Sequence, residues 1–172
     1  CGNETASNMY MFKKFMIDST EFWASEYKLG GFRFDLMAIH DTKAMDELTV
    51  NLHENVSPNL AVYGEPWAGG GIALPSTFVS ANQGAMNSFK GYGAFNDQMR
   101  NALIKGGMGG FENKGWATNK DSVDGNDANT IKLGIAGKTN SSNTDASKSI
   151  QYVTCHDNFT LYDKLLMSVE TE

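Results

Sequence analysis

The sequence predicts an α/β fold in which short parallel strands alternate with helices. Over residues 7–29, apolar residues recur at three- and four-residue spacing, as they do on one face of a helix. Two short β-like runs, 32–37 and 60–63, flank a second segment of helical spacing. Strand, helix and strand in so short a span form a βαβ unit with parallel strands. The 172 residues, 41% hydrophobic and 20% charged, correspond to one soluble domain or to a large piece of one.

Residues 7–29 are predicted to form the first helix. Charged residues lie largely between its apolar positions, which are Phe12, Phe15, Met16, Phe22, Trp23 and Tyr27. Because such side chains are usually buried, we expect this stripe to pack in the core rather than to hold a cofactor. Gly30 and Gly31 then end the helix.

The run 32–37 reads as a buried strand that carries two charges. Arg33 and Asp35 stand at alternate positions, so they share one face of the strand. Burying two charges is costly unless they pair or serve a site. The pair is therefore either a structural ion pair near a strand end or a catalytic carboxylate that a guanidinium keeps ionised.

The second helix and strand complete the βαβ unit. Asp41 or Thr42 can cap a helix whose apolar positions are Met45, Leu48 and Leu52. The run 60–63 leads into Gly64-Glu65-Pro66-Trp67. The glycines that follow lack the helix and lysine of a phosphate-binding loop, so we assign them to a flexible loop.

The rest of the chain continues the alternation. We expect, in order, a strand end at 91–97, a helix at 98–105, a linker at 106–110, a surface loop at 111–125, a helix at 127–136, a loop at 138–148, a strand at 149–154 and a helix that begins near Tyr162.

Composition narrows the class of protein. The net charge of −6 and the pI of about 5.0 give no basic patch for a nucleic-acid partner. The sequence has no apolar run long enough to predict a membrane span. The two cysteines, Cys1 and Cys155, make no disulfide framework. They therefore do not indicate the cellular compartment of the protein. The N-terminus has neither an initiator Met nor a signal peptide, and we interpret it as a cut end.

Three predicted strands end in a carboxylate: Asp35, Glu65 and Asp157. In parallel α/β folds, functional sites lie at the carboxyl ends of the strands. Two carboxyl groups are the minimum set for glycoside hydrolysis, one as nucleophile and one as proton donor. Trp67 can serve either as a platform for a sugar ring or as a packed loop anchor.

The three carboxylates stand in the segments Gly31–Asp35 (GFRFD), Tyr63–Trp67 (YGEPW) and Tyr152–Asn158 (YVTCHDN). These segments resemble the second, third and fourth signature regions of the α-amylase family of glycoside hydrolases. The YGEPW form is similar to the type I pullulanase branch, as are residues 1–5, 34–41 and 156–161. The resemblance covers nearly the whole chain.

The resemblance implies a role for each site residue. Asp35 would be the nucleophile and Arg33 its ionising partner. Glu65 would be the general acid and later the base. Asp157 and His156 would bind sugar hydroxyls. The family retains anomeric configuration, which requires the two catalytic carboxyls roughly 5–5.5 Å apart.

The resemblance also implies a partial (β/α)8 TIM barrel. A complete barrel needs about 250 residues, so residues 1–172 would be an incomplete catalytic domain, roughly strands 4 to 7 with their helices. The family's first signature, Asp-x-x-x-Asn-His, is absent. We interpret Cys155, beside the fourth signature's His-Asp, as a packing residue.

The implied function is hydrolysis of α-1,6 branch linkages in an α-glucan such as pullulan, starch or glycogen. Alternatives are an isoamylase, a glucan branching enzyme, or a catalytically silent glucan-binding fragment. The YGEPW segment favours a pullulanase over the two enzymes. No cofactor is expected. Calcium sites occur in the wider family, but nothing in these loops identifies one.

Overall fold

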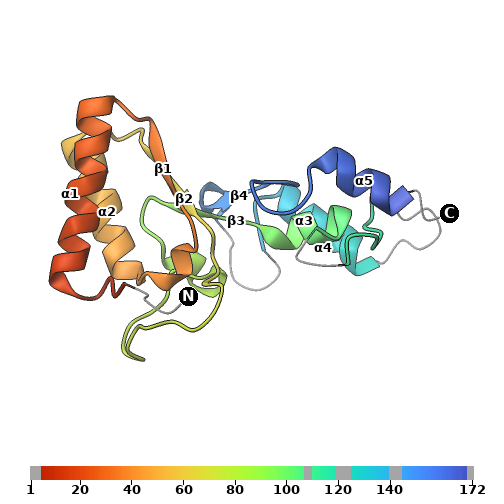
Figure 1. The fold of residues 1–172 in the computed structure, drawn as a ribbon, viewed down its shortest axis with the longest axis horizontal. Coiled ribbons are helices and arrows are strands. Elements are labelled where there is room, and N and C mark those ends of the chain that lie inside the picture. Colours follow the sequence, from red (N-terminus) through yellow and green to blue (C-terminus); the bar gives the residue numbers. More distant parts are fainter. Residues whose placement is uncertain (1–4, 107–109, 119–124, 140–144, 170–172) are drawn as a thin grey trace. The chain divides into compact units, whose positions relative to one another are not determined.

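The computed structural model describes residues 5–106, 110–118, 125–139 and 145–169 (Figure 1). The chain divides into two compact units, residues 1–95 and 96–172. The predicted α/β class with parallel strands is confirmed. Residues 1–4, which belong to the segment 1–5 used for the family resemblance, lie outside the described residues. The (β/α)8 barrel stays a prediction. Among the described helices, none has the length and apolar character needed to cross a membrane.

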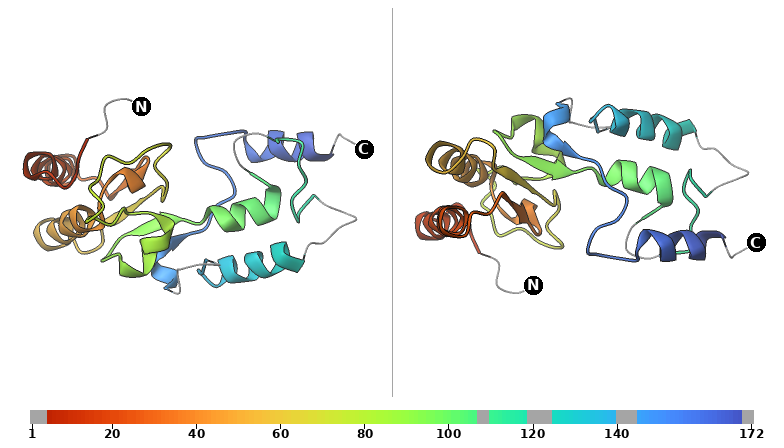
Figure 2. Two further views of the ribbon diagram at one scale, coloured as in Figure 1. Left: turned by 90° about the horizontal axis from the view of Figure 1, so that it is seen from below. Right: turned by 90° about the horizontal axis from the view of Figure 1, so that it is seen from above.

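Over residues 5–95, the first unit contains two helices and three strands. They are α1 (Tyr10–Tyr27), β1 (Gly31–Phe34), α2 (Thr42–Asn55), β2 (Ala61–Gly64) and β3 (Gly93–Phe95), with 3-10 turns η1 (Met37–Ile39) and η2 (Gln83–Ser88). β1 and β2 pair in parallel, with Phe34 opposite Gly64, and β2 pairs in parallel with β3. The predicted βαβ unit is therefore confirmed. α1 and α2 lie side by side (Figures 1 and 2).

The start of α2 is fixed by its cap. Of the two predicted capping residues, Asp41 takes the position, and its side chain accepts a hydrogen bond from Ala44 N at 3.0 Å. The buried Ser7 hydroxyl donates to Asp41 Oδ2 at 2.6 Å and accepts from Asp41 N at 2.8 Å. The segment before α1 is thus tied to the first turn of α2.

The core of the first unit lies where α2 packs over the strands and the segment before β3. Its predicted helix positions Met45, Leu48 and Leu52 are all fully buried. They cluster with side chains from α1, from the strands and from the connecting segments, namely Met16, Ala24, Met37, Leu60, Val62, Ala81, Met86, Phe89, Tyr92 and Ala94. The sheet end that carries the carboxylates is therefore built on a packed interior.

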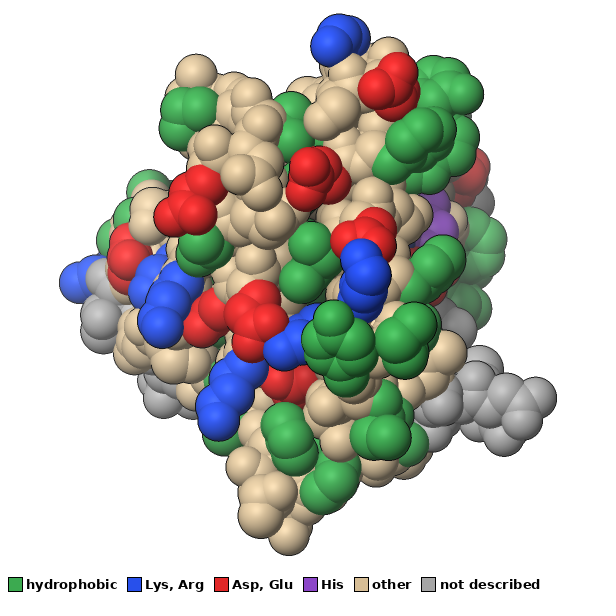
Figure 3. All heavy atoms as spheres, turned by 90° about the vertical axis from the view of Figure 1, so that its left-hand side faces the viewer, with side chains coloured by type: hydrophobic (Ala, Val, Ile, Leu, Met, Phe, Trp, Pro, Cys, Tyr) green, Lys and Arg blue, Asp and Glu red, His purple; other side chains and the backbone are tan. Residues whose placement is uncertain are grey.

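The prediction that the whole apolar stripe of α1 is buried is wrong. Met16 is buried and Phe12 packs against the core, but Phe15, Phe22 and Trp23 are 65%, 52% and 45% exposed. These rings lie on helix positions that α2 does not cover, because they occupy more of the helix circumference than one neighbouring helix can bury. Figure 3 faces the left-hand side of Figure 1, where α1 lies, and shows hydrophobic side chains among charged ones.

Two strands are shorter than predicted. β1 ends at Phe34, because Leu36 adopts a left-handed backbone with φ of 46° and the chain turns into η1. β4 covers only Ser149–Ile150, and the remainder of the predicted strand 149–154 is irregular. Apolar alternation gives the approximate position of a strand, whereas backbone turns set its end.

In its described residues, the second unit carries three further helices, as predicted. They are α3 (Asp97–Ile104), α4 (Gly125–Ile135) and α5 (Leu161–Val169), with the 3-10 turn η3 (Ala146–Lys148) before β4. The buried Asn96 caps α3 by accepting from Met99 N, and its amide nitrogen donates to Lys138 O at 3.0 Å. Parts of the three predicted loops, residues 107–109, 119–124 and 140–144, lie outside the described residues.

Candidate active site

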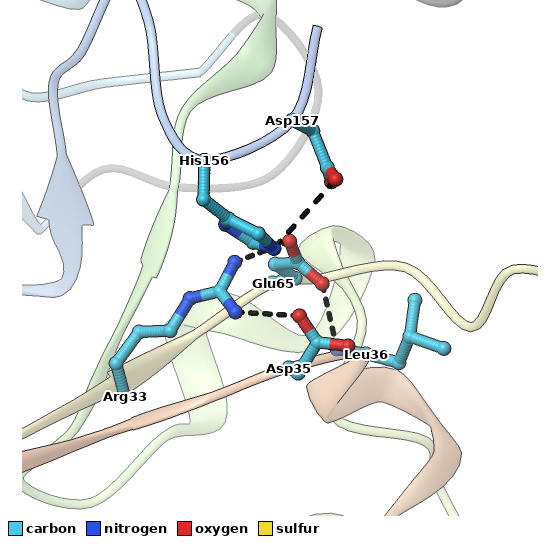
Figure 4. Close-up of polar contacts among 6 residues, drawn as sticks. All are labelled: Arg33, Asp35, Leu36, Glu65, His156 and Asp157. Atoms are coloured by element: carbon cyan, nitrogen blue, oxygen red, sulfur yellow. Dashed lines mark hydrogen bonds and ion pairs between the residues drawn. The ribbon is translucent and has the colours of Figure 1, made fainter.

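The first unit brings Arg33, Asp35 and Glu65 together at the carboxyl ends of β1 and β2. Phe34 and Gly64 are register partners, so the next residue of each strand emerges at the same edge. Arg33 Nη1 donates to Asp35 Oδ1 at 2.5 Å, and Arg33 Nη2 pairs with Glu65 Oε1 (Figure 4). One guanidinium therefore joins the two carboxylates that the sequence predicts as the catalytic pair.

The two carboxylates have different surroundings. The Glu65 side chain is 1% exposed and that of Asp35 is 63% exposed. The second oxygen of Glu65, Oε2, accepts from Leu36 N at 2.7 Å. A buried carboxylate is costly unless its oxygens are paired, and here a guanidinium and a backbone N–H meet that need. Asp35 instead presents its carboxylate to solvent.

Arg33 is held in its charged form. Burial opposes the charge, but the hydrogen bond that Arg33 donates to Asp35 and the charges of the two carboxylates outweigh burial and raise the pKa of the guanidinium. The guanidinium carbon also lies 5.6 Å from the centre of the Phe95 ring. A cation placed over an aromatic face is attracted to it, so Phe95 helps to fix the position of Arg33.

Sequence reasoning missed Phe95 and Leu36 as contributors to this site. Phe95 ends β3, is 9% exposed and contacts Tyr63 edge-to-face at 5.5 Å. Its place at a strand end was visible in the sequence, but its contact with Arg33 depends on strand order. Leu36 contributes through its backbone N–H, and a pattern of side chains in the sequence does not predict such a backbone contact.

Trp67 lies in the loop after β2. Its backbone oxygen accepts from Ala38 N at 3.3 Å, which ties this loop to η1, and its side chain is half-buried. The backbone contact fits the loop-anchor interpretation, and the intermediate burial of the residue is compatible with either role. The platform role of Trp67 stays a prediction.

His156 and Asp157 belong to the second unit. They follow β4 in an irregular segment, with side chains 55% and 54% exposed and His156 Nε2 at 3.6 Å from Asp157 Oδ1 (Figure 4). Asn158 next to them adopts a left-handed backbone with φ of 66°, which turns the chain. Their approach to Asp35 and Glu65 stays a prediction.

Comparison with known proteins gives matches over the length of the chain. It is 32% identical to "Pullulanase A" of Streptococcus pneumoniae over 99% of its own length and 13% of the relative's. A pullulanase structure from Bacillus acidopullulyticus matches with a TM-score of 0.87 and 39% identity, over 100% of this chain and 20% of that one. No family model matches the chain.

A second solved structure adds a bound ligand. The Paenibacillus barengoltzii pullulanase in complex with maltohexaose and α-cyclodextrin matches with a TM-score of 0.87 and 36% identity, over 100% of this chain and 26% of that one. Together with the α/β fold, these matches support a class for the chain, the glycosidase family to which the matched pullulanases belong. Within this class, the chain corresponds to a fragment of a pullulanase.

Proposed function

We propose that this chain supplies the catalytic residues of a retaining glycoside hydrolase that cleaves α-1,6 branch linkages in pullulan, starch or glycogen-type glucans. The observation that carries the proposal is the Arg33 guanidinium, which contacts both Asp35 and Glu65. A retaining enzyme needs its two carboxyl groups roughly 5–5.5 Å apart. A shared guanidinium is compatible with that separation.

In the first step, a carboxylate oxygen of Asp35 attacks the anomeric carbon. Glu65 gives its proton to the glycosidic oxygen, the bond to the departing glucan breaks, and an ester forms between the sugar and Asp35. The solvent-facing position of Asp35 suits attack on an incoming chain. Both oxygens of Glu65 accept hydrogen bonds in the structure, so substrate has to displace one of these contacts before Glu65 can carry a proton to the leaving group.

In the second step, Glu65 takes a proton from water and the oxygen of that water attacks the same carbon. The ester breaks, Asp35 is released as a carboxylate, and Glu65 regains its proton. One water is consumed for each linkage. Asp157 and His156 are proposed to hold sugar hydroxyls, and Trp67 to stack against a sugar ring.

The proposed setting is a (β/α)8 barrel, of which residues 1–172 supply roughly strands 4 to 7. The parallel order of β1, β2 and β3 supports this arrangement. The chain spans only 13% of the pneumococcal relative, so the remaining sugar contacts are proposed to lie outside these residues.

A segment exchange tests the proposal. The matching segment of the Bacillus acidopullulyticus pullulanase is replaced by this chain, and release of reducing ends from pullulan is measured. We expect the exchanged protein to cleave pullulan, and Glu65→Gln to lower the rate by about 10²–10⁴. Glu26→Gln, an exposed glutamate on α1, is the matched control and should leave the rate unchanged. A folded exchanged protein that binds maltohexaose but cleaves nothing would instead indicate a glucan-binding remnant.

A further inference from the structure

Three different metal-ligand side chains follow one another in the second unit. Cys155, His156 and Asp157 offer a sulfur, an imidazole nitrogen and a carboxylate oxygen, and these three atoms lie within 4.8 Å of one another. His156 Nε2 and Asp157 Oδ1 are 3.6 Å apart. The sequence alone suggested only a packing role for Cys155.

These separations are close to those of ligands around zinc. Zn²⁺ binds thiolate sulfur at about 2.3 Å and nitrogen or oxygen at about 2.0–2.2 Å, in a tetrahedral arrangement. Two such ligands then lie about 3.3–3.7 Å apart. The His156–Asp157 pair already has this spacing, and the sulfur needs to approach by about an ångström at most. We propose that Cys155, His156 and Asp157 form a zinc-binding site with one open coordination position.

The donor set favours zinc over calcium or magnesium. Thiolate and imidazole are soft to borderline ligands that suit Zn²⁺, whereas Ca²⁺ and Mg²⁺ take oxygen ligands. A site of three protein ligands leaves the fourth position to water or to another small ligand.

The ion can reach this site from solvent. The side chains of His156 and Asp157 are about half exposed, and Cys155 is half-buried. Cys155 and Asp157 also line a cavity of about 20 Å³ between α3 and α5, which is enough for one water molecule. The irregular backbone of residues 151–160 allows the small approach that the sulfur has to make.

Zinc bound here would act as an inhibitor. This consequence rests on the proposed function, in which His156 and Asp157 hold sugar hydroxyls. A zinc ion that occupies their donor atoms removes both contacts from the glucan. Because glycoside hydrolysis by two carboxyl groups uses no metal, the ion would contribute nothing to the reaction itself.

Cobalt titration tests the site directly. The chain is titrated with Co²⁺, whose charge-transfer absorption reports a thiolate ligand, and Zn²⁺ affinity is measured by displacement. We expect one ion per chain, with the absorption lost in Cys155→Ser and Zn²⁺ affinity lowered at least about tenfold. Cys1→Ser is the matched control and should titrate like the wild type. Asp157→Asn should also weaken binding while the thiolate band remains.

Several outcomes would overturn the proposal. Equal zinc affinity in the wild type and in Cys155→Ser, or a band that disappears in Cys1→Ser instead, would show that the three residues do not bind the ion. Circular dichroism of each variant identifies those that have unfolded. For an unfolded Cys155→Ser, the same titration is made on the Cys1→Ser chain with Cys155 alkylated after folding.

The inhibition is measured separately in the exchanged protein, as maltohexaose binding with and without zinc. Loss of glucan binding on zinc addition in the wild type, but not in Cys155→Ser, is the expected result. If zinc binds as described and the exchanged protein has no affinity for glucan, the proposed function fails while the zinc site stands.

Discussion

The backbone nitrogen of Leu36 lies 2.7 Å from Oε2 of Glu65, although 29 positions separate the two residues along the chain. Leu36 makes this contact from a left-handed conformation, which is costly for a residue with a side chain. Strained backbone of this kind concentrates at functional sites. The left-handed turn thus ends β1 and holds the buried carboxylate.

Leu36→Pro should remove both features, because proline lacks the N–H and fixes φ near −65°. We expect the free energy of unfolding to fall by about 3 kcal/mol or more. Leu36→Gly keeps the N–H and accepts a positive φ, so its loss should stay within about 1 kcal/mol. Urea denaturation of both variants measures the difference. Similar losses in the two would show that the backbone contact is unimportant.

Arg33→Gln should leave the buried Glu65 without its ion-pair partner, while the hydrogen bond from Leu36 N remains. Removing one partner of a buried ion pair costs about 3–5 kcal/mol, and the lower end applies here because Arg33 is 24% exposed. Adding Glu65→Gln should recover part of this loss. A double-mutant cycle with unfolding free energies gives the coupling, and additive losses would argue against a stabilising pair.

Protonation of His40 should destabilise the first unit as the pH falls. His40 is buried against Phe12 and Phe34, and burial lowers its pKa from 6.5, opposed in part by Asp41. Below pH 6.5 the unfolded chain then binds more protons than the folded one, so stability falls from pH 6.5 toward 5 by at most about 1.4 kcal/mol per unit. Thermal denaturation across this range should show the fall in the wild type and its absence in His40→Leu.

Phe15 and Met16 are neighbours in sequence but should respond differently to truncation. Met16→Ala removes a buried side chain and should cost about 2–3 kcal/mol. Phe15→Ala removes a side chain that is 65% exposed and should change stability by less than about 0.5 kcal/mol. Equal losses in chemical denaturation would place Phe15 in a packed environment.

Residues 1–172 alone should hydrolyse pullulan at least about a thousandfold more slowly than the exchanged protein. Loss of about 4 kcal/mol of transition-state binding, from sugar contacts outside the chain, would account for this factor. Reducing ends released from pullulan provide the measurement. Turnover near that of a complete debranching enzyme, abolished by Asp35→Asn, would show that these residues are sufficient.

The sequence determined the class and order of the elements because both depend on local spacing. The helices at α1 and α2, the βαβ unit and the cap at Asp41 all follow from apolar periodicity and short-range hydrogen bonding. Alternation on one strand likewise placed Arg33 and Asp35 together. The carboxylates at strand ends predicted the edge at which the site lies.

Tertiary structure decided which of these groups touch and which are covered. The register of β1 against β2 brings Glu65 to Arg33, and the place of β3 beside them adds Phe95. Phe15 is exposed because burial depends on the neighbouring element as well as on helical spacing. The contact from Leu36 N depends on a backbone turn. Such contacts join residues far apart in the chain, and local sequence pattern carries no information about the distances between them.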